Sequence, residues 1–363
     1  MVTTLDRYIA RQFGLNYVIA FSVLVSLYVV LDLFFNLDEF YQGTDLGIAE
    51  IAIAVAKYYA THLFWYFSQI SGVITLFAMA FTLARMQRDN EFVAIISSGV
   101  SLYRIALTVI VLGVALNGLL LIDQELIIPR LAPKLAQTHK AVALNKPYGV
   151  WFLRQEGGSL LSASQFDHES GVLRDVLLIP SPADQLAETI VADRATWEPN
   201  PQGGPGTWVL ERGQLLSIIP NDDGGYDTLK KPLANFRSET GPDEIALRQS
   251  TRWVDFLSRS QLIKLGESGM GLPARIAAAI HNRFSTPIVN MLILIIGVPI
   301  FLDRHPSTVV QRGGQCLLIC GACFLLAYFC RSMTFKEQVA LAAWLPIILL
   351  APTMVIMLDR LKT

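Results

Sequence analysis

The stretch FGLNYVIAFSVLVSLYVVLDLFF, from Phe13 to Phe35, decides the architecture of this chain. Its 23 residues include one charged side chain, Asp32. An apolar run of about 20 residues can cross a bilayer core as a helix. Arg7 and Arg11 precede the run, as in a signal peptide, but it is longer than a usual signal core and no A-x-A cleavage pattern follows. We therefore expect a retained membrane span.

Five further apolar runs repeat this pattern, two before and three after a polar middle. They are Ala60–Ala84, Ile105–Ile122, Pro287–Leu302, Gly314–Phe329 and Val339–Leu358. The 16% of charged residues is low, because soluble domains carry about 25%. The net charge of −1 gives no general attraction to nucleic acid. We predict three membrane helices in residues 1–127, an extramembrane domain in 128–271 and three membrane helices in 272–363.

The distribution of Lys and Arg predicts the orientation. One set of short loops and ends carries nine basic residues: Arg7, Arg11, Arg85, Arg88, Arg104, Arg304, Arg312, Arg360 and Lys362. The opposite loops carry three: Lys57, Arg331 and Lys336. Cytoplasmic loops are the ones enriched in basic residues. We therefore expect both termini in the cytoplasm and the polar domain outside it.

The polar domain reads as a series of short strands separated by turn residues. The strand candidates are Gly149–Arg154, Ser159–Ala163, Val172–Ile179, Thr189–Trp197, Thr207–Glu211, Gln214–Ile219 and Tyr226–Phe236. Gly157-Gly158 and Arg212-Gly213 suggest hairpins. About eight strands at this spacing predict an all-β sandwich or jelly roll. We also expect a helix break at Pro129–Lys134 and no long amphipathic helix before about Ser258–Leu265.

The segment RMQRDNEFVAIISSGVSLYR (Arg85–Arg104) separates two predicted spans on the cytoplasmic side. Asn90 can cap a helix, Glu91 suits its first turn, and Gly99 can end it. Phe92, Val93, Ile95 and Ile96 give it an apolar side. The predicted helix at 90–98 is too short to span a membrane. It is either a plain connector, which the pattern alone favours, or a coupling helix that docks into a cytoplasmic partner.

Catalytic and metal-binding patterns are missing from the sequence. It contains no G-x-x-x-x-G-K-[ST], G-x-S-x-G or H-E-x-x-H motif, and its histidines are scattered. Cys316, Cys320 and Cys323 have the C-x3-C-x2-C spacing of an iron–sulfur motif. They lie inside an apolar span and share one helix face with Cys330, which favours packing in lipid. We assign no catalytic residue, no metal site and no cofactor to this chain.

Basic residues at the outer membrane edge are the candidates for binding lipid phosphates. They are Arg130, Lys134, Arg275, Arg283, Arg331 and Lys336. Arginine and lysine bind phosphates well, but both also serve as snorkelling anchors at helix ends. The sequence leaves these two roles open.

The chain resembles the LptF/LptG (YjgP/YjgQ) family of lipopolysaccharide export permeases over nearly its whole length. The matching stretches are LDRYIARQF (Leu5–Phe13), NEFVAIISSGVS (Asn90–Ser101), VADRATWE (Val191–Glu198), RFSTPIVNMLILIIGVPI (Arg283–Ile300) and AAWLPIIL (Ala342–Leu349). The LDRY start and DLFFNLDEF (Asp32–Phe40) are more similar to LptG than to LptF.

The resemblance implies a permease subunit of an ABC transporter in the bacterial inner membrane. Its implied partners are a second, LptF-like permease, an LptB-like ATPase dimer that holds ATP and Mg²⁺, LptC/LptA-like jelly-roll proteins, and lipopolysaccharide. It implies that the loop helix docks in the ATPase, with Glu91 at the family's acidic docking position. The coupling-helix candidates are Arg88, Glu91, Phe92, Ala94, Ile95 and Gly99.

One departure from the family concerns the first span. Enterobacterial members carry lysines near its outer end, where this chain has Asp32, Asp38 and Glu39. Either the partner subunit together with Arg130 and Lys134 supplies the positive charge, or the lipid headgroup differs.

Two other functions compete with lipid export. A membrane enzyme acting on lipid headgroups, with the outer domain as a lid, would need a cluster of acid, base or metal-binding residues at one membrane face. A signalling or adhesion scaffold would give the loop helix and the intramembrane Asp32 and Asn117 no purpose. The sequence favours a non-catalytic transporter subunit that depends on a separate ATPase.

Overall fold

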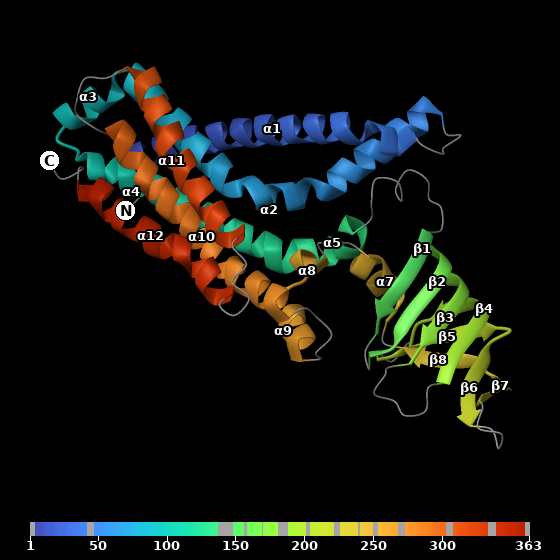
Figure 1. Ribbon diagram of the computed structural model, residues 1–363. Helices are drawn as coiled ribbons and strands as arrows, with labels where there is room; N and C mark the ends of the chain where they lie inside the picture. The colour runs from blue at the N-terminus through green and yellow to red at the C-terminus, as the bar shows by residue number, and fades with distance from the viewer. Residues whose placement is uncertain are drawn as a thin grey trace. The chain divides into compact units, whose positions relative to one another are not determined.

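The structure is a computed structural model of the whole chain (Figure 1). It describes residues 4–41, 47–136, 148–155, 158–168, 170–180, 188–200, 204–220, 226–238, 240–249, 253–267, 273–302, 308–332 and 339–359. Contacts divide the chain into two compact units. The helical unit comprises residues 1–34, 62–128 and 273–363, and the β unit comprises residues 35–61 and 129–272.

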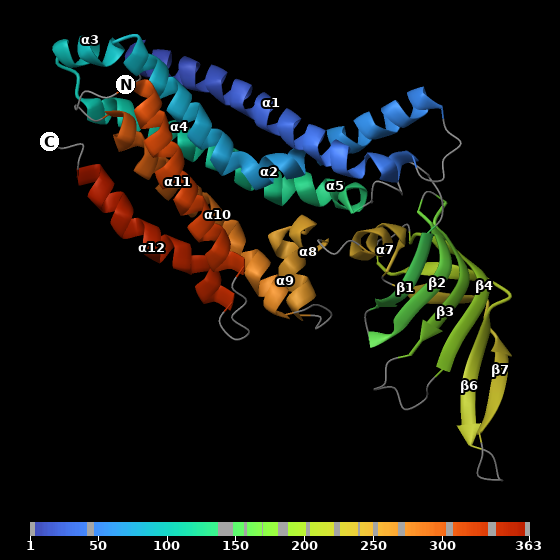
Figure 2. The ribbon, with the colours of Figure 1, turned by 45° about the horizontal axis from the view of Figure 1, so that its top comes forward.

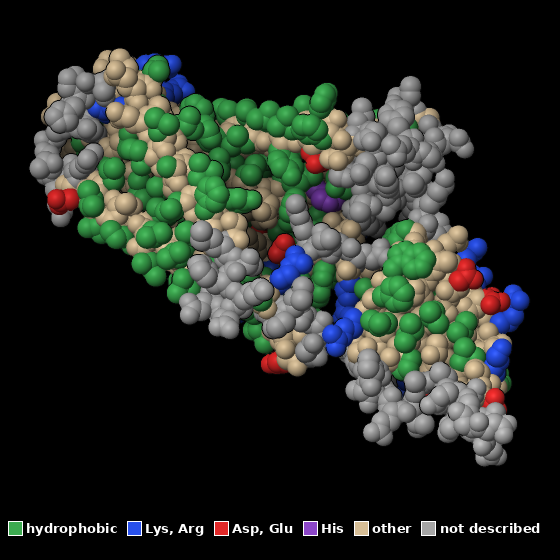
Figure 3. Space-filling view, in the orientation of Figure 1, with side chains coloured by type: hydrophobic (Ala, Val, Ile, Leu, Met, Phe, Trp, Pro, Cys, Tyr) green, Lys and Arg blue, Asp and Glu red, His purple; other side chains and the backbone are tan. Residues whose placement is uncertain are grey.

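Six helices in the described residues are long and apolar enough to cross a membrane. They are α1 (Thr4–Tyr41), α2 (Ile48–Arg88), α4 (Leu102–Ile122), α10 (Pro273–Leu302), α11 (Val309–Ser332) and α12 (Val339–Asp359). This confirms the prediction of six spans around a polar middle. Most helices extend beyond the apolar runs, because polar residues at their ends continue the helix. Exposed apolar side chains cover much of the visible face of this part of the chain (Figure 3).

The predicted helix break at Pro129–Lys134 is wrong. After α4 the chain forms a π-helical turn, η1 (Asp123–Ile127), and then a further helix, α5 (Ile128–Leu135). Pro129 lies in the first turn of α5, where a proline is tolerated. Helical backbone bonding, in modified form, therefore continues to Leu135.

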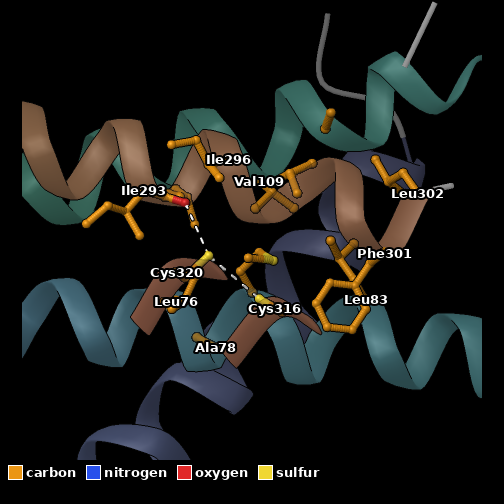
Figure 4. Packing of buried hydrophobic residues seen from close by; sticks show 14 of the residues in the cluster. Leu76, Ala78, Leu83, Val109, Ile293, Ile296, Phe301, Leu302, Cys316 and Cys320 are labelled. Carbon is orange, nitrogen blue, oxygen red and sulfur yellow. Dashed lines mark hydrogen bonds between the residues drawn. The ribbon is translucent and has the colours of Figure 1, made fainter. Parts of the chain in front are cut away.

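The core of the helical unit forms around α10. Figure 4 shows α10 residues such as Ile293 and Phe301 packed among side chains of α2, α4 and α11. The Cys320 thiol lies 3.8 Å from the Ile293 carbonyl oxygen and 3.9 Å from the Cys316 sulfur. Both cysteines are buried and neither forms a disulfide. The prediction that they pack against neighbouring helices is confirmed.

The β unit is built on one antiparallel sheet, which confirms the predicted β domain. Its strands are β1 (Tyr148–Arg154), β2 (Leu160–Asp167), β3 (Val172–Ile179), β4 (Glu188–Glu198), β5 (Gly206–Glu211), β6 (Gln214–Pro220), β7 (Tyr226–Pro232) and β8 (Asn235–Ser238). Strands β1 to β4 pair with their neighbours in chain order. Gly158, at a φ of +85°, helps to turn β1 into β2, as predicted; Gly157 lies outside the described residues.

The predicted hairpin at Arg212-Gly213 is wrong. Both β5 and β6 pair with β4, in one continuous register that runs from Glu198 opposite Thr207 to Glu188 opposite Ser217. Arg212 has a φ of +55°, but the chain continues in the same direction through this kink. The guanidinium of Arg212 lies 2.8 Å from the carboxylate of Asp193 on β4. Figure 2 shows β6 and β7 extending from the sheet as the true hairpin.

Three short helices follow the sheet: α7 (Pro242–Gln249), α8 (Trp253–Phe256) and α9 (Arg259–Glu267). The predicted helix corresponds to α9. The sequence pattern does not predict α7, which is too short to reveal a helical period. Ile245 and Ala246 of α7 are nevertheless buried in the hydrophobic core of the sheet. In the same core, burial raises the pKa of Tyr148 to about 12.

Replacing Gly113 by leucine should loosen the contact between α4 and α10. A Cβ atom at Gly113 would lie 2.2 Å from the Leu294 Cδ2, whereas one at Gly118 on the same helix would meet nothing within 4 Å. We expect Gly113→Leu to lower the free energy of unfolding by about 1–3 kcal/mol. Gly118→Leu is the matched control and should be near neutral. Equal losses in detergent-unfolding curves would contradict this packing.

Candidate functional site

The loop helix, α3 (Glu91–Ser97), lies between α2 and α4. Its end follows the prediction. Gly99 has a φ of +83°, its N–H donates to the Ile96 carbonyl, and the Val100 N–H donates to the Ile95 carbonyl. This is the Schellman arrangement that a glycine terminates. Its beginning differs, because Asn90 has a φ of +57° and makes no side-chain capping bond. The capping role predicted for Asn90 is therefore wrong.

The predicted apolar side of α3 is split between two directions. Phe92 is 9% exposed and belongs to the core of the helical unit, and Ile95 packs against that core. Val93 is 67% exposed and Ile96 is 42% exposed. Ala94 is also exposed. We call Val93, Ala94 and Ile96 the α3 patch.

Charged residues surround α3. The Arg88 Nε lies 3.2 Å from the Asp89 carboxylate, and Arg88 is exposed. Glu91 is half-buried and accepts a hydrogen bond of 2.7 Å from the Tyr8 hydroxyl of α1. Basic side chains gather at the α3 end of the helical unit in Figure 3. Sequence reasoning missed Tyr8, since no local pattern connects residues 83 positions apart.

A second pair of contacts joins the start of α1 to the start of α4. The Asp6 carboxylate lies 3.3 Å from the Arg104 guanidinium and accepts a hydrogen bond of 3.2 Å from the Thr108 hydroxyl. Further along α1, the Asn16 side-chain amide donates to the Thr82 hydroxyl of α2 over 2.9 Å. The first turns of α1 therefore contact α2, α3 and α4.

Of the six lipid-phosphate candidates, Arg283 has a clear partner within the chain. Its side chain is 8% exposed and lies 2.6 Å from the Glu125 carboxylate. It also donates to the Gln124 carbonyl over 3.2 Å. The Ile128 N–H donates to the backbone carbonyl of Asp123. In the same pattern, the N–H of residue 129 would donate to the backbone carbonyl of Gln124. Residue 129 is a proline and has no N–H to donate, so the Arg283 guanidinium donates to this carbonyl instead.

The other candidates are placed differently. Arg130 and Lys134 are exposed on α5 of the β unit, four residues apart, and Arg275 is exposed on α10 of the helical unit. Arg331 is half-buried, and its Nε and Nη2 have no hydrogen-bond partner among the described residues. Lys336 lies outside the described residues. A common ring of these residues stays a prediction.

Asp123 is a buried carboxylate that sequence reasoning overlooked. It is 1% exposed, and neither of its oxygens has a hydrogen-bond partner within the described part of the chain. It opens the π-helical turn, a feature that often marks functional positions. The acidic pair Asp123 and Glu125, directly after the apolar run, is the signal that would have revealed it. Asn117, by contrast, donates to the Gly113 carbonyl over 2.9 Å.

Comparison with known proteins identifies a related family. The family model described as "Lipopolysaccharide export system permease LptF/LptG" matches residues 7–360. The match does not separate the two named subtypes, so the LptG-like assignment stays a prediction. No curated protein matches the chain. Among the described residues, no group of three His, Cys, Asp or Glu side chains could hold a metal ion.

Breaking the Arg283–Glu125 pair should destabilise the helical unit. Arg283→Leu leaves the Glu125 carboxylate without its guanidinium, and we expect a loss of about 2 kcal/mol, reduced by the partial exposure of Glu125. Arg283→Leu combined with Glu125→Leu should recover part of that loss. Arg275→Leu on the same helix is the control. A double variant as unstable as the sum of the two single variants would exclude the pairing.

Asp123→Asn should leave stability unchanged or raise it, by up to about 2 kcal/mol. An ionised carboxylate buried without a donor is costly, and the amide keeps its shape without the charge. Asp6→Asn is the control. Asp6 has an ion-pair partner in Arg104, so this variant should be less stable than the unmodified protein. Thermal unfolding of the purified protein measures both. A clear loss in Asp123→Asn would indicate a cationic or donor group that stabilises the charge.

Proposed function

The chain belongs to the LptF/LptG family of lipopolysaccharide export permeases, and we propose that it works as the permease subunit of an ABC transporter whose ATPase is a separate cytoplasmic chain. The family and the six spans make it a multi-pass inner-membrane protein. The observation that carries the proposal is the α3 patch. A short helix between two spans presents apolar side chains outward while its other side is fixed in the core.

The α3 patch has the properties of a docking surface. Exposed Val93 and Ile96 gain from burial against another protein. Phe92 and Ile95 hold the helix in the core, and Gly99 fixes where it ends. Arg88 adds an exposed charge at its edge. The excess of basic residues supports a cytoplasmic position, where an ATPase dimer similar to LptB would bind.

The spans would form half of a lipid cavity, with an LptF-like permease as the other half. The support is the outer part of α1, where Leu27, Val30 and Phe34 are exposed. Such a surface is suited to lipid or to apolar helices of a partner. Lipopolysaccharide carries phosphates, for which the exposed Arg130 and Lys134 are the candidate contacts.

The β unit would pass the lipid to LptC/LptA-like jelly-roll proteins outside the cytoplasm. The support is strand β1, which pairs with β2 alone among the described strands. An edge strand of a sheet can accept a strand from another domain. Trp151, which is 68% exposed, and Phe152 add apolar surface there. The branch of the sheet formed by β6 and β7 instead carries Lys230 and Lys231 on β7.

Acidic substitutions in the α3 patch test the docking. We expect Val93→Asp combined with Ile96→Asp to abolish co-purification of the ATPase subunit, since two charges would have to be buried in the interface. Val310→Asp, at an exposed valine in the first turn of α11, is the matched control and should keep the ATPase bound. Undiminished ATPase binding in the double variant would contradict the proposed function.

A further inference from the structure

A hydrogen bond between the Tyr8 hydroxyl and the Glu91 carboxylate joins α1 to α3. Its 2.7 Å length joins a phenol hydroxyl to a carboxylate, which is a strong donor and acceptor pair. From it we propose that Tyr8 is a positioning residue that fixes α3 to α1 through Glu91, so that displacement of α3 by the ATPase is carried into the first span. This inference rests on the proposed function.

The direction of Glu91 favours this role over direct docking. Glu91 and Ile95 are four residues apart and therefore share one face of α3. Ile95 packs against the core of the helical unit, and the α3 patch faces outward. The family resemblance places Glu91 at an acidic docking position. In this chain its carboxylate is turned toward α1, and the α3 patch presents the outward surface.

The rest of α1 is arranged to pass such a displacement along. Ile9 and Phe13 are fully or almost fully buried in the core close to Tyr8. Asp6 contacts α4, and Asn16 contacts α2. From Thr4 to Phe34 the helix is continuous, a rod of about 45 Å at 1.5 Å per residue. Its inner end is held by polar bonds to three elements, while its outer half exposes apolar side chains.

This arrangement would let α1 transmit movement along its length. Because a helix is stiff, a shift at the Tyr8 end would also displace the exposed half near Phe34. The outer half of α1 is the surface proposed above to face lipid. The bond between Tyr8 and Glu91 would therefore couple ATPase motion to the wall of the lipid cavity, and it would contribute little to binding the ATPase itself.

The test uses the assembled transporter in lipid vesicles that contain lipopolysaccharide. Tyr8→Phe removes the hydroxyl that donates to Glu91 and also bonds with Gln12, and Glu91→Ala removes the acceptor. Glu91→Gln keeps an oxygen acceptor but removes the charge. Three quantities are measured for each variant: ATPase co-purification, the rate of ATP hydrolysis, and lipid released per ATP hydrolysed.

We expect Tyr8→Phe and Glu91→Ala to lower lipid release per ATP by about ten-fold or more, the effect of losing one hydrogen bond to a charged group. ATPase binding should persist in Tyr8→Phe. Glu91→Gln keeps an acceptor and should be less impaired than Glu91→Ala, and the Tyr8→Phe, Glu91→Ala double variant should be no worse than either single variant. Tyr103→Phe, at an exposed tyrosine in the first turn of α4, is the control.

Two outcomes would overturn the inference. Unchanged lipid release in Tyr8→Phe would remove its role in positioning. Equal defects in Glu91→Gln and Glu91→Ala, with ATPase lost from both, would make Glu91 a docking charge. In either case the proposed function survives. Failure of the unmodified chain to bind any ATPase would reject the proposed function itself, and so the two failures can be told apart.

Discussion

Close packing around α10 is the constraint on which the helical unit depends. Leu294 occupies the space left by Gly113 of α4, and Asn290 occupies the space left by Gly72 of α2. The Ile293 carbonyl meets the Cys320 thiol of α11. Lipid tails are as apolar as leucine, so helices in a membrane associate through shape rather than through the hydrophobic effect. Small residues at these contacts are therefore what lets the other helices surround α10.

The same constraint decides where charges can lie. Arg283 is tolerated near this packing because Glu125 and the Gln124 carbonyl satisfy it. The π-helical turn and Pro129 make that carbonyl available, so one local irregularity of the backbone serves a partner about 160 residues away in sequence. Asp123 begins that turn without such a partner in the described residues. This buried carboxylate sets the turn apart from α4, where the buried Asn117 bonds to the Gly113 carbonyl.

The sequence predicts those parts of the fold whose cause is local. Span number follows from apolar run length, because a bilayer forces the backbone to satisfy its own hydrogen bonds. The end of α3 follows from Gly99, which adopts a left-handed conformation. The hairpin predicted at Arg212-Gly213 is wrong, because a residue in the left-handed conformation fits both a hairpin turn and a kink within one strand direction. The pairing of both β5 and β6 with β4 shows that it is a kink. Of the candidate site, α3 is predictable, whereas the partners of Glu91 and Arg283 lie beyond any local pattern.

The division of α1 into two halves connects these features to transport. Force from another protein has to enter through a surface, and α3 is too short to reach across a membrane by itself. A span that is bonded to α2, α3 and α4 at one end and exposed at the other can carry that force the remaining distance. Under the proposed function, the sparse burial of the far half of α1 would let a shift at its Tyr8 end displace a surface that faces lipid.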